Sequence, residues 1–226
     1  MEHANTEQTF LPGIKEAETS RAVLYNLFAT LLARKTDETW LNPHFQKQLQ
    51  FGLPDSEGKA AVLSALERAR KDLGYYQELQ LDYDRLFIVP GPNLTFPYES
   101  CYTCRNIDGT FGRLWQEPAQ DMQRILKEWE IEFAEGWDLI PDHIAVELFF
   151  MSELCQRRAN AKGPDDGEAI RNWQVNFFHK HLSPWVFEFL NRLEEKAETA
   201  FYRGGAKLLY EFLTEEKIDL VLYEEK

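Results

Sequence analysis

The sequence lacks any long apolar run. No stretch of about 18 apolar residues, the length that a membrane-spanning helix needs, occurs in the 226 residues. Residues 1–9 are polar and hold no apolar core of signal-peptide length. The sequence therefore predicts no stable membrane insertion and no secretory route, and we expect a cytoplasmic protein.

Cysteine is scarce, with 3 in the whole chain. An odd set is unlike the disulfide framework of a small secreted domain. Cys101 and Cys104 form a Cys-x-x-Cys pair. A structural zinc site needs further ligands, and a thioredoxin-type motif needs a βαβ setting. Neither is visible, so chance spacing is one interpretation and a redox-sensitive or metal-ligating thiol pair is the other.

Basic residues are outnumbered by acidic ones. Lysine and arginine number 25 against 38 aspartates and glutamates, which gives a formal charge of −13. A field of this sign repels nucleic acid and anionic lipid, whereas it attracts basic peptides and speeds their encounter. Solubility alone would also account for the charge, so it is evidence for a basic partner only beside a specific site.

Signatures of catalysis and of cofactor binding are missing. The sequence has no GxxxxGK[ST] phosphate loop and no nucleophile elbow. His143 and Glu147 have the spacing of one helical turn, but His179 and His181 would point to different faces of a helix, and no further pair completes a zinc set. We predict no enzymatic activity, no metal and no bound cofactor.

Helical periodicity, in contrast, runs through nearly the whole chain. Apolar residues recur every three or four positions, and strand-type alternation of useful length is absent. We predict an all-α fold of about 8–10 helices in a single domain, residues 1–226. The expected helices cover residues 14–34, 36–50, 59–73, 75–87, 118–132, 141–161 and 168–181, then one from Pro184 with Ser183 as its N-cap, and 206–213.

A stretch rich in proline and glycine interrupts this pattern at residues 89–116. Proline lacks an amide hydrogen and restricts its predecessor, so regular helix is not expected there. Structureless connections beyond about 15 residues are uncommon in a compact domain, which indicates a hinge or a functional loop. Residues 1–88 and 117–226 would then be two helical subdomains. A second break is expected at Arg203-Gly-Gly205, where the glycines should end a helix.

Two motifs concentrate aromatic and acidic residues. The first runs from Asp82-Tyr-Asp-Arg-Leu-Phe87 to Pro97-Tyr-Glu-Ser-Cys-Tyr102, and the second is Pro141-Asp-His-Ile-Ala-Val-Glu147. Large aromatics in a loop need a packing partner or a ligand. Asp142 and His143 are expected in the first turn of a helix, where aspartate favours the helix dipole. One interpretation is structural, a capping aspartate and a locally hydrogen-bonded histidine; the other is a docking surface.

The order and separation of these motifs resemble those of the TorD/DmsD/NarJ family, cytoplasmic chaperones of molybdenum-containing redox enzymes. The matching residues are Tyr83, Leu86, Phe87, Gly91, Pro92, Pro97, Tyr98, Glu99, Ser100 and Tyr102, then Pro141, Asp142, His143, Ile144, Glu147, Leu148, Phe150 and Met151. The Cys101–Cys104 pair lies outside the family pattern.

The resemblance implies an all-helical chaperone that binds the precursor of a molybdopterin-dependent oxidoreductase. In many members the bound element is a basic twin-arginine leader, held until the cofactor is inserted. The resemblance also allows a monomer or a domain-swapped dimer, with residues 89–116 at the swap hinge.

The candidate client-binding residues combine aromatic or aliphatic lining with acidic groups. They are Tyr25, Leu86, Phe87, Pro97, Tyr98, Glu99, Tyr102, Asp142, His143 and Glu147. A leader helix in such a groove would gain roughly 1.5–3 kcal/mol for each buried apolar side chain and only about 0–1 kcal/mol for each exposed ion pair. The alternatives are a helical adaptor that remains in an oxidoreductase complex and a nucleotide-hydrolysing enzyme that uses Asp142 and His143.

Overall fold

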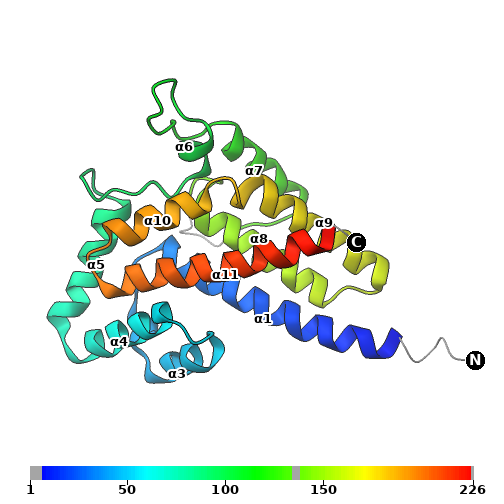
Figure 1. Cartoon of the computed structure of the whole chain (residues 1–226), viewed down its shortest axis with the longest axis horizontal. Helices are drawn as coiled ribbons and strands as arrows, with labels where there is room; N and C mark the ends of the chain where they lie inside the picture. Colours follow the sequence, from blue (N-terminus) through cyan, green and yellow to red (C-terminus); the bar gives the residue numbers. More distant parts are fainter. Residues whose placement is uncertain (1–6, 134–137, 225–226) are drawn as a thin grey trace, which may run out of the picture.

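The computed structural model describes residues 7–133 and 138–224, and these residues are almost entirely helical (Figure 1). The elements are α1 (Glu7–Ala33), α2 (Glu38–Leu41), α3 (Pro43–Gly52), α4 (Glu57–Lys71), α5 (Leu73–Phe87), α6 (Glu99–Thr103), α7 (Glu117–Glu128), α8 (Ile144–Ala159), α9 (Pro164–Phe177), the π-helical turn η1 (Phe178–Leu182), α10 (Val186–Lys196) and α11 (Ala200–Glu224). The described residues form no strand, only an isolated antiparallel bridge between Tyr98 and His143. The predicted all-α class is confirmed.

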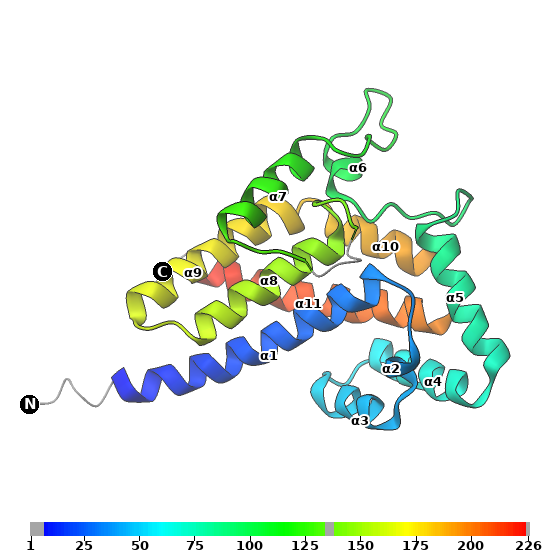
Figure 2. The ribbon, with the colours of Figure 1, turned by 180° about the vertical axis from the view of Figure 1, so that it is seen from behind.

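Three long helices organise the packing. α1 lies along α8, and α11 packs against both α4 and α10, as the two opposite views show (Figures 1 and 2). Helices that precede the 89–116 stretch therefore pack directly against helices that follow it. None of the helices in the described ranges is both long and apolar enough to cross a bilayer.

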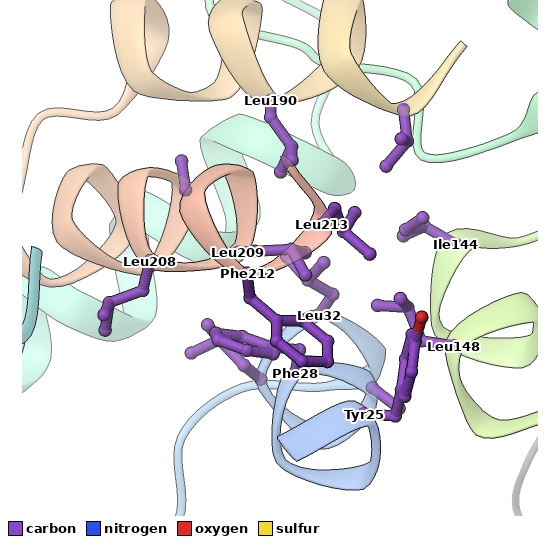
Figure 3. Close-up of a cluster of buried hydrophobic side chains, with 14 of the residues drawn as sticks. Tyr25, Phe28, Leu32, Ile144, Leu148, Leu190, Leu208, Leu209, Phe212 and Leu213 are labelled. Atoms are coloured by element: carbon purple, nitrogen blue, oxygen red, sulfur yellow. The ribbon is translucent and has the colours of Figure 1, made fainter. Parts of the chain in front are cut away.

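The core forms where these long helices meet α10 (Figure 3). Its labelled side chains come from α1, α8, α10 and α11, and are Tyr25, Phe28, Leu32, Ile144, Leu148, Leu190, Leu208, Leu209, Phe212 and Leu213. All of them are buried, and α8 is apolar and buried on most of its sides. Burying a residue of leucine or phenylalanine size contributes about 1.5–3 kcal/mol, so this cluster contributes substantially to the stability of the fold.

The predicted break at Arg203-Gly-Gly205 is wrong, because α11 runs through it without interruption. The glycines serve a close approach between helices instead of ending one. A Cβ atom at Gly204 would lie 2.8 Å from the carbonyl oxygen of Gly58 on α4 and 2.9 Å from Ala61 Cβ. Contacts under 3.0 Å are not tolerated by real Cβ atoms, so the missing side chain lets α4 and α11 come together.

Other helix boundaries also differ from the sequence pattern. The expected helix over residues 36–50 is two helices, divided where Asn42 caps α3 and Pro43 takes its first position. Ser183 is not an N-cap, since α10 begins at Val186 after Trp185. Within the 89–116 stretch, where no regular helix is expected, the short α6 forms. The division at Asn42 thus follows from a local cap.

Candidate functional site

The structure brings the two motifs into direct contact. The amide of Ile144 donates to the carbonyl of Pro97 at 2.9 Å, and the amide of Glu99 donates to the carbonyl of Asp142 at 3.0 Å. These two bonds frame the antiparallel bridge between Tyr98 and His143. The start of α6 is thereby fixed to the start of α8, and we call this contact the α6–α8 junction.

Asp142 caps α6 from a distance. The N-terminus of α6 follows Tyr98, whose side chain makes no capping bond. Instead, Asp142 Oδ2 accepts a 2.8 Å hydrogen bond from the Ser100 amide and a second, short one from the Ser100 hydroxyl. Asp142 is fully buried, and its role differs from the expected one, because it precedes α8 rather than lying in its first turn. Its carboxylate caps α6, the helix that belongs to the other motif.

His143 is the N-cap of α8, not part of its first turn. Its Nδ1 accepts a 3.0 Å hydrogen bond from the Ala145 amide. Burial lowers the pKa of His143 to about 3, so the imidazole is neutral at physiological pH and Nδ1 is free of a proton. The ring also packs edge-on against Tyr98, with centroids 5.1 Å apart. His143 thus makes the local hydrogen bond that the structural interpretation expects.

Behind these caps lies a buried polar cluster around Glu99 and Glu147. Glu99 Oε2 lies 2.9 Å from His181 Nδ1, and Glu147 Oε2 accepts a 3.2 Å hydrogen bond from Trp185 Nε1. Burial raises the pKa of Glu99, although His181 opposes this effect. Burial, and then the charges of Glu99 and Asp142, raise the pKa of Glu147 well above the ordinary glutamate value. The cluster therefore favours keeping a proton.

The aromatic candidates surround this cluster with different exposure. Tyr102 is buried between Phe111 and Trp185, at centroid distances of 5.0 and 5.3 Å. Pro97 is buried and Tyr98 is half-buried. We call the candidates gathered here the junction group: Pro97, Tyr98, Glu99, Tyr102, Asp142, His143 and Glu147.

The remaining candidates lie elsewhere. Leu86 and Phe87 are buried at the end of α5, where Phe87 contacts Tyr83 at a centroid distance of 4.9 Å. Tyr25 is in the central core, and its hydroxyl donates to Glu216 Oε2 at 2.8 Å. The same carboxylate binds Arg21 through both oxygens, at 2.8 and 2.5 Å. Tyr25 thus belongs to a buried ionic network that ties α1 to α11.

The Cys101–Cys104 pair lies in and just after α6, and both thiols are free. Cys101 is buried, and burial raises the pKa of its thiol to about 12, which leaves little reactive thiolate at neutral pH. Within residues 7–133 and 138–224, no three His, Cys, Asp or Glu side chains are arranged to hold a metal ion.

Sequence reasoning missed His181, Trp185 and Asp121 as members of the polar cluster. His181 Nε2 lies 3.5 Å from Asp121 Oδ2 of α7, so the imidazole links Asp121 to Glu99. Lys180 pairs with the same aspartate. These residues are far from the motifs in sequence and follow no recognisable spacing, so only the folded chain places them at the junction.

Comparison with known proteins matches the motifs to a family. Residues 54–191 match the family described as "Nitrate reductase delta subunit". The chain is similar to the Chaperone protein TorD of Vibrio parahaemolyticus, with 27% identity over 206 residues that cover 88% of this chain and 94% of the relative. It is similar also to the Chaperone protein TorD of Photobacterium profundum, with 29% identity over 199 residues, 85% of this chain and 90% of the relative.

The matched segment spans more than half of the chain and contains both motifs with the whole α6–α8 junction. This agreement confirms the resemblance drawn from the residues. The chain belongs to the nitrate reductase delta subunit family, which is the TorD/NarJ family.

Proposed function

We propose that this protein is a cytoplasmic chaperone that binds the N-terminal leader of a molybdenum-cofactor oxidoreductase precursor and supports cofactor insertion. The observation that carries the proposal is the likeness to two proteins named TorD chaperones over 94% and 90% of their lengths. A likeness of that extent takes in 88% and 85% of this chain, not a single motif. The −13 charge of the chain suits a basic leader.

The junction group is our proposed client-binding site, and it is closed in this structure. Every candidate residue is buried except Tyr98, which is half-buried. A client can reach these side chains only if residues 97–103 move away from α8. Residues 89–96 and 104–116 flank this segment and form no helix. The segment can therefore shift without unfolding α5 or α7.

Opening the junction has a free-energy cost that a bound client must offset. Separating the segment breaks the two backbone bonds at the bridge, at about 1 kcal/mol each, and the bonds of Ser100 to the charged Asp142, at about 1.5–3 kcal/mol each. It also exposes the buried ring of Tyr102. A leader that buries four leucine-sized side chains gains about 6–12 kcal/mol, and its ordering costs about 2–5 kcal/mol. In this proposal apolar lining supplies most of the affinity, while the acidic groups set the register and the speed of capture.

A pull-down from the native cytoplasm tests this function. Tagged protein is isolated under gentle conditions, and co-purifying proteins are measured intact by mass spectrometry. We expect an oxidoreductase precursor that still carries its leader and lacks its molybdenum cofactor. Capture of mature, cofactor-loaded enzyme alone would contradict the chaperone proposal and favour a resident adaptor subunit.

A leader peptide provides the matched control. A synthetic leader from the captured precursor should bind, and the same peptide with its arginine pair replaced by alanine should bind more weakly. Binding that is unchanged by the replacement would show that the leader's basic pair is not what the chain recognises.

A further inference from the structure

Two glutamates of the junction meet side by side in the protein interior. Glu99 is 4% exposed and Glu147 is 0% exposed, and their carboxyl groups are within hydrogen-bonding reach of each other. Ionised carboxylates only accept hydrogen bonds, so two of them cannot bond together. A single proton turns one into a donor. The pair is attractive when it holds a proton and repulsive when it does not.

Two nearby buried oxygens add to the cost of ionising this pair. Glu147 Oε1 and Asp142 Oδ1 are buried, and neither receives a hydrogen bond from the backbone or side chains that the structure describes. A buried ionised group without full pairing costs several kcal/mol. A proton on Glu147 removes one negative charge from this cluster. It also lets Glu147 donate a hydrogen bond to Glu99.

We propose that a proton shared by Glu99 and Glu147 latches the 97–103 segment to α8, and that its loss releases the segment. The latch would regulate access to the client-binding site, and in that role it rests on the function proposed above. A cationic side chain of the client would replace the proton as the group that holds the carboxylates together. Client capture would thus exchange one positive charge for another.

The groups that face Glu147 show why a proton is needed there. α6 contributes Glu99, the turn before α8 contributes Asp142, and the residue before α10 contributes the neutral donor Trp185. The imidazole of His181 on η1 is engaged with Glu99 and with Asp121 of α7.

Other charged groups around the cluster are engaged elsewhere. Lys180 of η1 pairs with Asp121. His143, at the start of α8, is neutral. On α1, Glu18 and Arg21 lie beside Cys155, two turns farther along α8 than Glu147. No described lysine or arginine forms an ion pair with Glu147, so the proton is the counter-charge that the geometry supplies.

The direction of the pH response follows from the raised pKa values of Glu99 and Glu147. A carboxyl whose folded-state pKa is raised contributes stability that is fully present below the ordinary value of 4.5. That contribution is lost as the pH rises through the folded-state pKa. The latch is therefore closed in acid and weakens toward alkaline pH. Each pH unit inside this window changes the opening equilibrium by up to about tenfold.

Amide hydrogen exchange, read by mass spectrometry from pH 6 to pH 9 and corrected for intrinsic exchange, tests the latch. The reporting amides are those of Glu99, Ser100 and Ile144, which bond across the junction. In the wild-type protein their protection should fall by up to about tenfold per pH unit, while the core of α8 stays protected.

Glu147→Gln provides the decisive variant, because an amide donates like the protonated acid and cannot ionise. It should keep the junction amides protected across the whole pH range. Glu215→Gln, at an exposed position on α11, removes the same charge far from the cluster and should behave like the wild type. Protection that is independent of pH in the wild type, or that falls equally in Glu147→Gln, would overturn the latch.

Peptide binding separates this inference from the proposed function. The probe is a synthetic peptide with an arginine pair followed by a leucine-rich stretch, titrated at pH 6 and pH 8. We expect tighter binding at pH 8 for the wild type and weaker binding by Glu147→Gln. A peptide that never binds, beside pH-dependent exchange, would refute the leader-binding function and leave the latch. A peptide that binds equally at both pH values, beside flat exchange, would refute the latch alone.

Discussion

The capping of α6 by Asp142 provides the sharpest test of the junction. Asp142→Ala removes the acceptor of the Ser100 amide and the Ser100 hydroxyl, both of which are buried. Hydrogen bonds to a charged group are worth about 1.5–3 kcal/mol, and the orphaned amide carries its own desolvation penalty. We expect a loss of about 3 kcal/mol in the free energy of unfolding. For a domain of this size that corresponds to a fall of about 6–12 °C in Tm.

Thermal and urea unfolding followed by circular dichroism measure this loss. Asp142→Asn keeps an acceptor oxygen and should lose only about 1 kcal/mol. Asp72→Ala is the matched control, because Asp72 caps α5 locally through the Tyr75 amide and is exposed. It should cost about 1 kcal/mol, the usual value of a surface cap. If Asp142→Ala is no more destabilising than Asp72→Ala, the buried long-range cap is not the interaction we take it to be.

Four further outcomes can be checked independently. Glu216→Ala leaves Arg21 short of its bidentate partner and should cost about 3 kcal/mol in urea unfolding, whereas a loss near zero would mean the network is dispensable. Gly204→Ala should lower Tm by forcing α4 and α11 apart, while Gly13→Ala, with open space around it, should raise stability by about 0.5–1 kcal/mol; equal effects would refute the close-approach argument. The depressed pKa of His143, about 3, means that its contribution is present above its ordinary value of 6.5 and lost as the pH falls toward 3; His143→Asn should flatten this acid limb of the stability profile. Raising salt should slow leader association in stopped-flow more than it speeds dissociation, and an unchanged on-rate would exclude electrostatic steering.

Local patterns predicted most of the longer helices, but not the division at Asn42, the short α6 or the long-range caps. α4 and α5 fall close to their expected ranges, because each has a regular apolar period and a capping residue beside it, Ser56 and Asp72. The break at Gly204 was wrong because a glycine pair has the same local signature whether it ends a helix or admits a neighbour. The difference lies in Gly58, on another helix.

The junction was only partly predictable for the same reason. The motifs identified Asp142, His143 and Glu147 as unusual, and the sequence indicated a possible cap. The helix that Asp142 caps lies 42 residues away, and the partner of Glu99 lies 82 residues away. Contacts between residues so far apart produce no repeating pattern in the sequence. That these side chains are buried rather than lining an open groove is likewise decided by packing, since α6 covers them.

The π-helical turn η1 sets the rotational phase between two helices. It inserts one extra residue per turn between α9 and the approach to α10, within Phe178–Leu182. If the same residues wound as a regular α-helix, everything beyond them would be rotated by about 100°. The His181 ring would then leave Glu99, and Trp185 would leave Glu147. The wide turn therefore aligns two partners of the buried cluster at once.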